Sequence, residues 1–146
     1  MPPHTIDLRG CLEQECALVR HFIDVLHDEA QALEHPDDNT ALQASTHAKN
    51  QCAESLAQVS NQRDALLAQQ GLPIGKQGLD ASSRNDPALA PLCHELQALA
   101  AEARRLNLEN GAAIEIYLTH TQRAIQTLRN LAGTSNLYNA KGRAIA

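Results

Sequence analysis

Apolar residues recur at steps of three and four along three long stretches of the chain, which is the spacing that places them on one face of an α-helix. The first stretch begins near Leu8, and Pro36 ends it because proline cannot continue a helix. Its apolar stripe consists of Leu8, Leu12, Cys16, Val19, Ile23, Leu26, Ala30 and Leu33. The pattern predicts a first helix over about residues 5–35.

A second helix is predicted over about residues 40–70, after a polar turn that contains several good N-cap residues. Its apolar stripe consists of Leu42, Cys52, Leu56, Val59 and Leu66 or Leu67. Ser45, Lys49 and Arg63 interrupt this stripe. We expect the two basic side chains to lie along the edge of the helix interface and to reach water with their charged tips.

A loop is predicted over residues 71–86, because the Gly71-Leu72-Pro73-Ile74-Gly75 cluster breaks the helical pattern. Asn85-Asp86-Pro87 then provides an N-cap and a proline at the first helical position. The third helix is expected over about residues 87–132, with Gly133 at its C-cap, followed by a flexible tail over residues 133–146. Its stripe consists of Leu92, Leu96, Leu99, Ala103, Leu106, Asn110, Ala113, Tyr117, His120, Ala124 and Leu131.

The predicted helices differ in length. At 1.5 Å per residue, the third helix would extend about 69 Å and the first two about 45 Å each, which leaves roughly 20 Å of the third helix uncovered. That end still carries a second apolar stripe of Ile114, Leu118, Ile125 and Leu128, with Ile116 on a further face. An apolar surface without an internal partner is normally an interaction site, so we expect it to bind a helix of a partner or of a second copy.

The alternative is a helix that breaks at Asn110-Gly111, since glycine inside a helix costs about 1 kcal/mol relative to alanine. The chain would then fold back into a four-helix bundle with nothing uncovered. In the preferred interpretation the chain is all-α. It is an antiparallel three-helix bundle, or coiled-coil hairpin, with a long third helix in a single domain over residues 1–146.

Composition and charge restrict the partners. The chain has no Trp, one Phe and two Tyr, so its core must be built mainly from Leu and Ala. A net charge of −5 argues against nucleic-acid binding. No apolar run is long enough to span a bilayer, and the N-terminus does not resemble a secretory signal. We therefore expect a cytoplasmic protein whose four cysteines are reduced.

No catalytic or metal-binding pattern is present in the sequence. A di-iron helical bundle would need paired Glu-x-x-His motifs, and none occurs. There is no Cys-x-x-Cys spacing and no glycine-rich phosphate loop. His21, His27 and His47 are expected on helix surfaces. We predict that the protein is not an enzyme and takes no cofactor and no metal.

Two short motifs stand out in the third helix and the tail: Leu106-Asn107-Leu108-Glu109-Asn110-Gly111 and Leu137-Tyr138-Asn139-Ala140-Lys141-Gly142-Arg143. The first resembles a Leu-Asn-x-x-Asn-Gly segment of the FlgN family of flagellar export chaperones, and the second resembles the ending of that family. Lys49, Leu56, Arg63, Leu66-Leu67 and Gly71-Leu72-Pro73 also follow the family pattern. The aromatic residue often found early in the third helix is missing, and Cys93 and His94 stand nearby.

The resemblance implies a cytoplasmic chaperone for the hook-associated proteins FlgK and FlgL, which would bind their C-terminal helical segments and deliver them to the flagellar export gate. On this hypothesis the contacts to the substrate protein come from Ile114, Tyr117, Leu118, Ile125, Leu128 and Leu131. Tyr117 is equally compatible with a core position. Asn107 and Asn110 are expected in structural roles, since a polar residue at a helix interface can fix its register.

By the same resemblance, Tyr138 in the tail is a candidate contact to the export gate. The competing hypothesis is a structural helical bundle that associates with itself and has no export role. A homodimer of the free chaperone would be compatible with either hypothesis.

Overall fold

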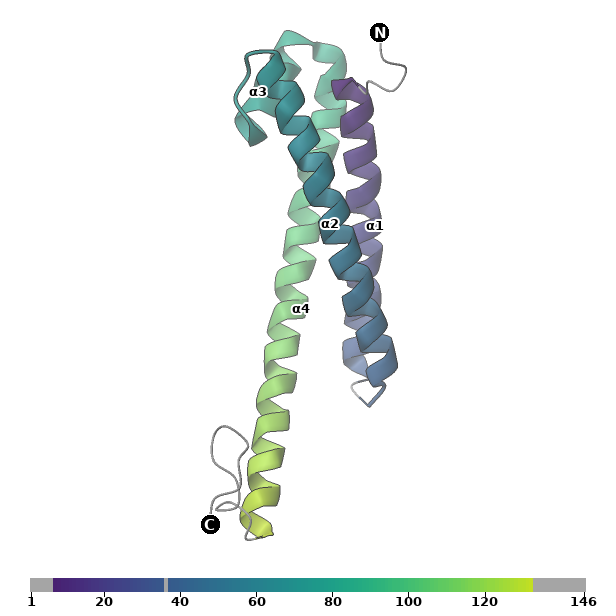
Figure 1. The fold of residues 1–146 in the computed structure, drawn as a ribbon, viewed down its shortest axis with the longest axis vertical. Helices are drawn as coiled ribbons and strands as arrows, with labels where there is room; N and C mark the ends of the chain where they lie inside the picture. The colour runs from purple at the N-terminus through teal and green to yellow at the C-terminus, as the bar shows by residue number, and fades with distance from the viewer. Residues whose placement is uncertain (1–6, 36, 133–146) are drawn as a thin grey trace. The chain divides into compact units, whose positions relative to one another are not determined.

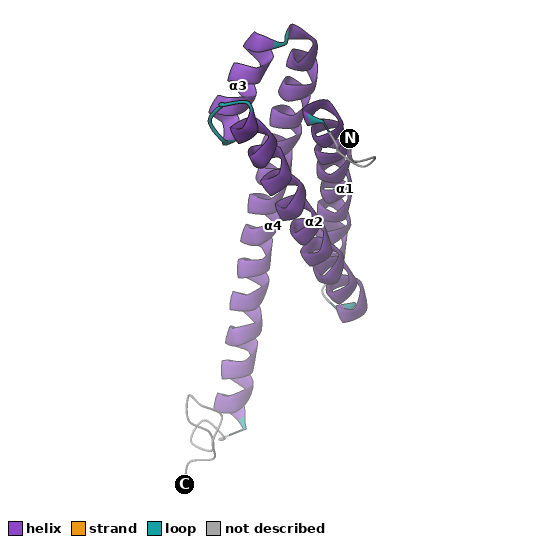
Figure 2. Ribbon diagram, turned by 45° about the horizontal axis from the view of Figure 1, so that its top comes forward, coloured by secondary structure: helices purple, strands orange, loops and turns teal. Residues whose placement is uncertain are grey.

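The computed structural model describes residues 7–35 and 37–132, and nearly all of them are helical (Figures 1 and 2). No strand occurs in these two ranges, which confirms the predicted all-α class. The chain divides into two compact units, Met1–Asn110 and Gly111–Ala146. The predicted tail over residues 133–146 lies outside the described ranges.

The first two helices form an antiparallel hairpin. Helix α1 (Leu8–Glu34) is capped by Asp7, whose carboxylate accepts a 2.8 Å hydrogen bond from the Gly10 amide. Helix α2 (Asn39–Gln69) is capped in the same way by Asp38, which accepts from the Ala41 amide at 3.2 Å. The two helices lie side by side and run in opposite directions, as Figure 1 shows. Both predicted helices are therefore present, and their ends lie at local capping signals.

The segment between α2 and the last helix was predicted wrongly as a loop. It contains a further helix, α3 (Gly75–Asn85), in which Leu79 and Ser82 are buried. The Asp64 carboxylate accepts a 3.1 Å hydrogen bond from the Gly75 amide at the start of α3. Two glycines and two serines make this sequence a weak helix former, so contacts with the rest of the first unit stabilise the helix where local propensity does not.

The last helix begins where the sequence predicts. Asp86 accepts a 3.1 Å hydrogen bond from the Ala88 amide and caps a 3-10 turn, η1 (Pro87–Leu89). Helix α4 (Ala90–Leu131) follows as one uninterrupted helix. The alternative of a break at Asn110-Gly111 followed by a fold-back is therefore wrong.

The core of the first unit is built from small and medium-sized apolar side chains, as the scarcity of aromatic residues requires. It consists of Leu8, Leu12, Cys16, Val19, Leu26, Leu67, Leu79, Leu89, Cys93, Leu96, Ala103 and Leu106. Phe22 is half-buried against this cluster. Cysteines in such a core act as small apolar residues.

Two buried carboxylates were not anticipated. Glu15 and Glu29 in α1 are each 2% exposed, and both pair with a basic residue of α2. Arg63 forms an ion pair with Glu15, and Lys49 donates to Glu29 at 3.2 Å. The expectation that Lys49 and Arg63 extend their tips into water was wrong, because buried carboxylates hold those tips inside the hairpin.

Candidate functional site

The second half of α4, residues 111–131, exposes large apolar side chains. Leu118, Ile125, Leu128 and Leu131 are 51%, 44%, 65% and 80% exposed. Ile114 and Tyr117 are half-buried. No residue of this half is buried, whereas the first half of the same helix contains five buried residues. All six residues that the sequence predicts to contact a substrate protein are therefore accessible to some degree.

Helical geometry places most of these side chains together. At about 100° per residue, Ile114, Tyr117, Leu118, Ile125 and Leu128 lie within an arc of about 100°, and Leu131 lies just beyond its edge. An apolar arc of that width is typical of a helix face that packs against another element. We call the six residues the α4 stripe. Ile116, which is 60% exposed, lies on the opposite face of the helix and does not belong to it.

Thr121 is a member of this face that the sequence analysis missed. Its position in the helical repeat falls between Tyr117 and Ile125, near the middle of the arc. The Thr121 hydroxyl donates a 3.0 Å hydrogen bond to the Tyr117 carbonyl oxygen. Because the helix itself satisfies the hydroxyl, the side chain can present its methyl group to a partner. The sequence prediction omits Thr121 because it counts only apolar residue types.

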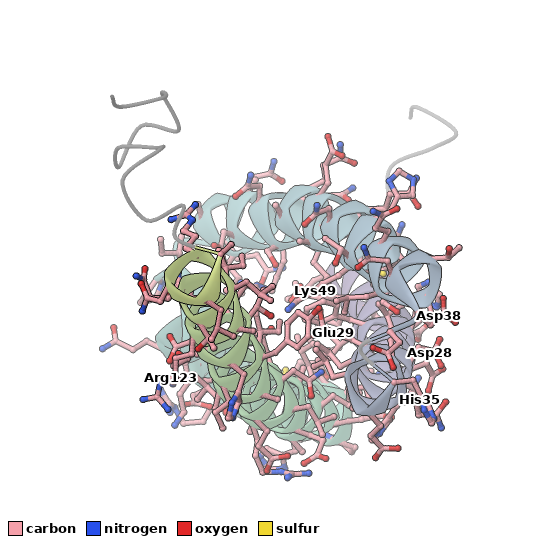
Figure 3. All side chains as sticks on the ribbon, turned by 90° about the horizontal axis from the view of Figure 1, so that it is seen from below. Asp28, Glu29, His35, Asp38, Lys49 and Arg123 are labelled. Carbon is pink, nitrogen blue, oxygen red and sulfur yellow. The ribbon has the colours of Figure 1, made fainter. Side chains whose placement is uncertain are left out.

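A buried polar cluster lies at the end of the first unit, immediately before the residues of the stripe. The Asn110 amide nitrogen donates to the Leu26 carbonyl oxygen at 2.8 Å and to the Glu29 carboxylate at 3.0 Å. Figure 3 shows the Glu29 and Lys49 side chains next to each other. This confirms the structural role predicted for Asn110, which joins α4 to α1 at one register. Asn107 is exposed instead.

The cysteines are held in apolar surroundings. All four are buried and unbridged. Burial raises the pKa of the Cys11, Cys16 and Cys52 thiols above its ordinary value. The Cys11 thiol donates to the Val59 carbonyl oxygen at 3.7 Å, and the Cys16 thiol donates to the Leu92 carbonyl oxygen at 4.0 Å. Because the thiolate is the reactive form, these side chains are packing residues and poor nucleophiles.

Two other kinds of site are absent from the described ranges. Residues 7–35 and 37–132 contain no cluster of three His, Cys, Asp or Glu side chains able to hold a metal ion. None of the helices there has the length and apolar character needed to cross a membrane. Tyr138, the predicted contact to the export gate, lies outside these ranges.

Comparison with known proteins gives two matches. The family model described as FlgN protein matches residues 1–145. A crystal structure of the FlgN chaperone from Bordetella pertussis is 43% identical in sequence, with a TM-score of 0.58. The alignment covers 84% of this chain and 95% of that one. No curated protein sequence matches.

Proposed function

This chain belongs to the FlgN family, and from that premise we propose that it acts as a chaperone in flagellar protein export. In this role the protein binds another protein in the cytoplasm and catalyses no reaction. The support is the match of the family over residues 1–145 together with the similarity to a FlgN chaperone structure over most of both chains.

The α4 stripe is the proposed binding surface for the exported protein. The single observation that carries this assignment is the exposure of several large apolar side chains along one face of residues 111–131. An amphipathic helix of a partner can pack on such a face with apolar residues spaced three and four apart. We propose that the partners are the C-terminal helical segments of FlgK and FlgL. Covering those segments would prevent their premature assembly, and delivery to the export gate would follow, with Tyr138 as the proposed contact to the gate.

The experiment is a calorimetric titration of the full chain with the C-terminal segments of FlgK and FlgL from the same organism. We expect saturable one-to-one binding and its loss in Leu128→Glu, since a charge at the centre of an apolar contact must be desolvated without a partner. Leu108→Glu is the matched control, because Leu108 is a similarly exposed leucine of α4 on another face. Binding by Leu128→Glu at full strength would refute the assigned surface, and failure of both segments to bind would refute the proposed partners.

Self-association is the competing use of the same surface, because an exposed apolar stripe also suits a second copy of the chain. Light scattering separates the two functions. A stable dimer that Leu128→Glu dissociates, combined with no affinity for FlgK or FlgL, would favour a structural bundle protein. A monomer that binds either segment would favour the chaperone.

A further inference from the structure

A second candidate surface lies entirely within the first unit. It is a cavity of about 450 Å³ bounded by residues of α1, α2, α3 and the first half of α4. That volume lies in the range of pockets that bind ligands or side chains of a partner. Its floor is formed by Val19, Phe22, Leu56, Leu79 and Leu96. Because Lys76, Ala100, Arg104 and Asn107 line it and are exposed, the cavity opens to solvent and forms a groove.

The groove is long enough to lie along about three turns of a helix. Three helices each contribute residues at steps of three and four: Glu15, Val19 and Phe22 from α1; Leu56, Ser60 and Arg63 from α2; and Leu96, Ala100, Ala103 and Asn107 from α4. The span from Leu96 to Asn107 corresponds to about 16 Å at 1.5 Å per residue, or three helical turns. The small alanine side chains in this wall would let a helix of a partner approach α4 closely.

Helix α3 forms one wall of the groove, and its position is fixed by the backbone. Gly75 has φ of +72°, a left-handed conformation that glycine adopts without strain. Gly78 packs so closely on the Pro73 carbonyl oxygen that a Cβ at this position would collide with it. These two glycines let α3 turn back onto the end of α2 and bring Lys76 and Leu79 to the groove.

The charges around the groove are unbalanced. The carboxylate among its lining residues, Glu15, already pairs with Arg63. Two further carboxylates bond to lining residues: Asp64 also pairs with Arg63, and Asp80 accepts a 3.2 Å hydrogen bond from Gln97. The basic groups of Lys76 and Arg104 are exposed and have no polar partner among residues 7–35 and 37–132. Although the chain has a net charge of −5, the rim of this apolar groove carries two basic side chains without an ion-pair partner in the described ranges. The complementary ligand is apolar along one face and acidic at its flanks.

The ends of this chain do not have that chemistry. Residues 133–146 contain Lys141 and Arg143 and no acidic residue, so they carry the same sign of charge as the rim. Residues 1–6 are also without an acidic residue. A segment of another protein fits the groove better than either end.

We infer that the groove bounded by α1, α2, α3 and the first half of α4 binds an acidic amphipathic helix of a partner protein. Apolar side chains of that helix fill the floor over Val19, Phe22 and Leu96, and its carboxylates pair with Lys76 and Arg104. Since every residue of the groove precedes Gly111, this surface is separate from the α4 stripe and does not depend on the proposed partners FlgK and FlgL.

The test uses two synthetic probes with the full chain. One is a fluorescein-labelled helical peptide of about 18 residues, with leucines spaced three and four apart and glutamates on both flanks; the other has lysines in place of the glutamates. Fluorescence anisotropy should show saturable binding of the glutamate peptide, weakened by added salt, and binding of the lysine peptide at least about tenfold weaker. No saturable binding of the glutamate peptide, or equal binding of both, overturns the proposal.

Variants locate the binding. Ala100→Trp fills the groove from an exposed position, and the double variant Lys76→Glu, Arg104→Glu reverses the rim charges. Each should weaken binding of the glutamate peptide by about tenfold or more. Arg84→Glu, an exposed charge reversal in α3 outside the groove, and Leu128→Glu in the α4 stripe should leave its binding unchanged. Circular dichroism and urea unfolding of each variant confirm that the fold is retained.

Three outcomes would contradict the location or the occupant. Unchanged binding by both groove variants would place the peptide elsewhere, and loss of binding in Leu128→Glu would assign it to the α4 stripe. A dimer of the free chain that Ala100→Trp dissociates would make a second copy the occupant. Binding of FlgK and FlgL is tested with Leu128→Glu, whereas peptide binding in the groove is tested with the Ala100 and Lys76/Arg104 variants. The two proposals can therefore fail independently.

Discussion

The two halves of α4, residues 90–110 and 111–131, both present apolar side chains at helical spacing, yet only the first half contains buried ones. Cys93, Leu96, Ala103, Leu106 and Asn110 are buried in the first half. In the second half, Leu118, Ile125, Leu128 and Leu131 are between 44% and 80% exposed. The same spacing of residues therefore serves a protein core in one half and an accessible surface in the other.

The helices also differ in length. Helix α4 has 42 residues, against 27 in α1 and 31 in α2, which corresponds to about 63 Å against about 40 and 46 Å. The Asn110 side chain donates hydrogen bonds to Leu26 and Glu29, which lie in the last third of α1. Asn110 is the last residue of the first unit, and α4 continues for 21 more residues, from Gly111 through Leu131. Periodicity thus identifies the apolar face of the helix, but it does not show which part of that face is buried.

The largest effect is expected from truncating one leucine in each half. Leu106→Ala in the first half should lower the free energy of unfolding by about 3 kcal/mol, because it removes a side chain only 7% exposed and leaves a cavity. Leu128→Ala in the second half should change it by less than about 0.5 kcal/mol, since that side chain is 65% exposed. Urea unfolding monitored by circular dichroism measures both values.

The two leucines are matched in helix and residue type, so helix propensity changes equally in the two variants. Similar losses in both would mean that residue 128 is buried in the free protein in solution. The second half of α4 would then be covered before any partner binds, and the comparison between the two halves would fail.

A smaller loss of stability is expected from removing a basic side chain, and it should again differ between the two units. Arg63→Met should lower the free energy of unfolding by about 2 kcal/mol, because it leaves the buried Glu15 carboxylate without its partner. Arg123→Met, an exposed position in the second unit, should change it by less than about 0.5 kcal/mol. Equal effects would show that the Glu15 pair contributes no more than a surface charge.

The loss in Arg63→Met should depend on pH. Burial raises the pKa of Glu15, and the Arg63 guanidinium opposes that rise, so removing Arg63 raises the pKa further. A native state with a raised carboxyl pKa holds its proton more tightly than the unfolded chain, so its stability is greatest at low pH and falls as pH rises through the folded-state pKa. The difference from the unaltered protein should therefore be larger near pH 7 than near pH 4. A difference that grows toward low pH would contradict this origin.

Much of the fold could be predicted because its signals are local. Asp38 and Asp86 cap helices that begin within a few residues of the predicted positions. The apolar spacing also predicts the large apolar side chains that are exposed in residues 111–131. These predictions succeed because capping and periodicity depend on residues close together in the sequence.

The features that were missed depend on contacts between distant residues. Helix α3 forms from weak helix formers because Leu79 is buried and Asp64 holds the Gly75 amide. Glu15 and Glu29 are of a residue type that is normally exposed. Their burial is explained by partners distant in the sequence: Arg63 for Glu15, and Lys49 and Asn110 for Glu29. The groove beside α3 could not be predicted for the same reason.

The smallest effect is expected at Gly111, the first residue of the second unit and an interior residue of α4. A Cβ built there meets nothing within 4 Å, and its φ is not positive, so Gly111→Ala should introduce no strain. Alanine restricts the unfolded chain more than glycine does and should raise the free energy of unfolding by about 0.5–1 kcal/mol. Urea unfolding tests this, with Ala113→Gly, an exposed position in the same helix, as the opposite change. If both variants altered helical circular dichroism without moving the unfolding midpoint, the second half of α4 would melt separately from the core, and the two halves would differ in cooperativity as well as in burial.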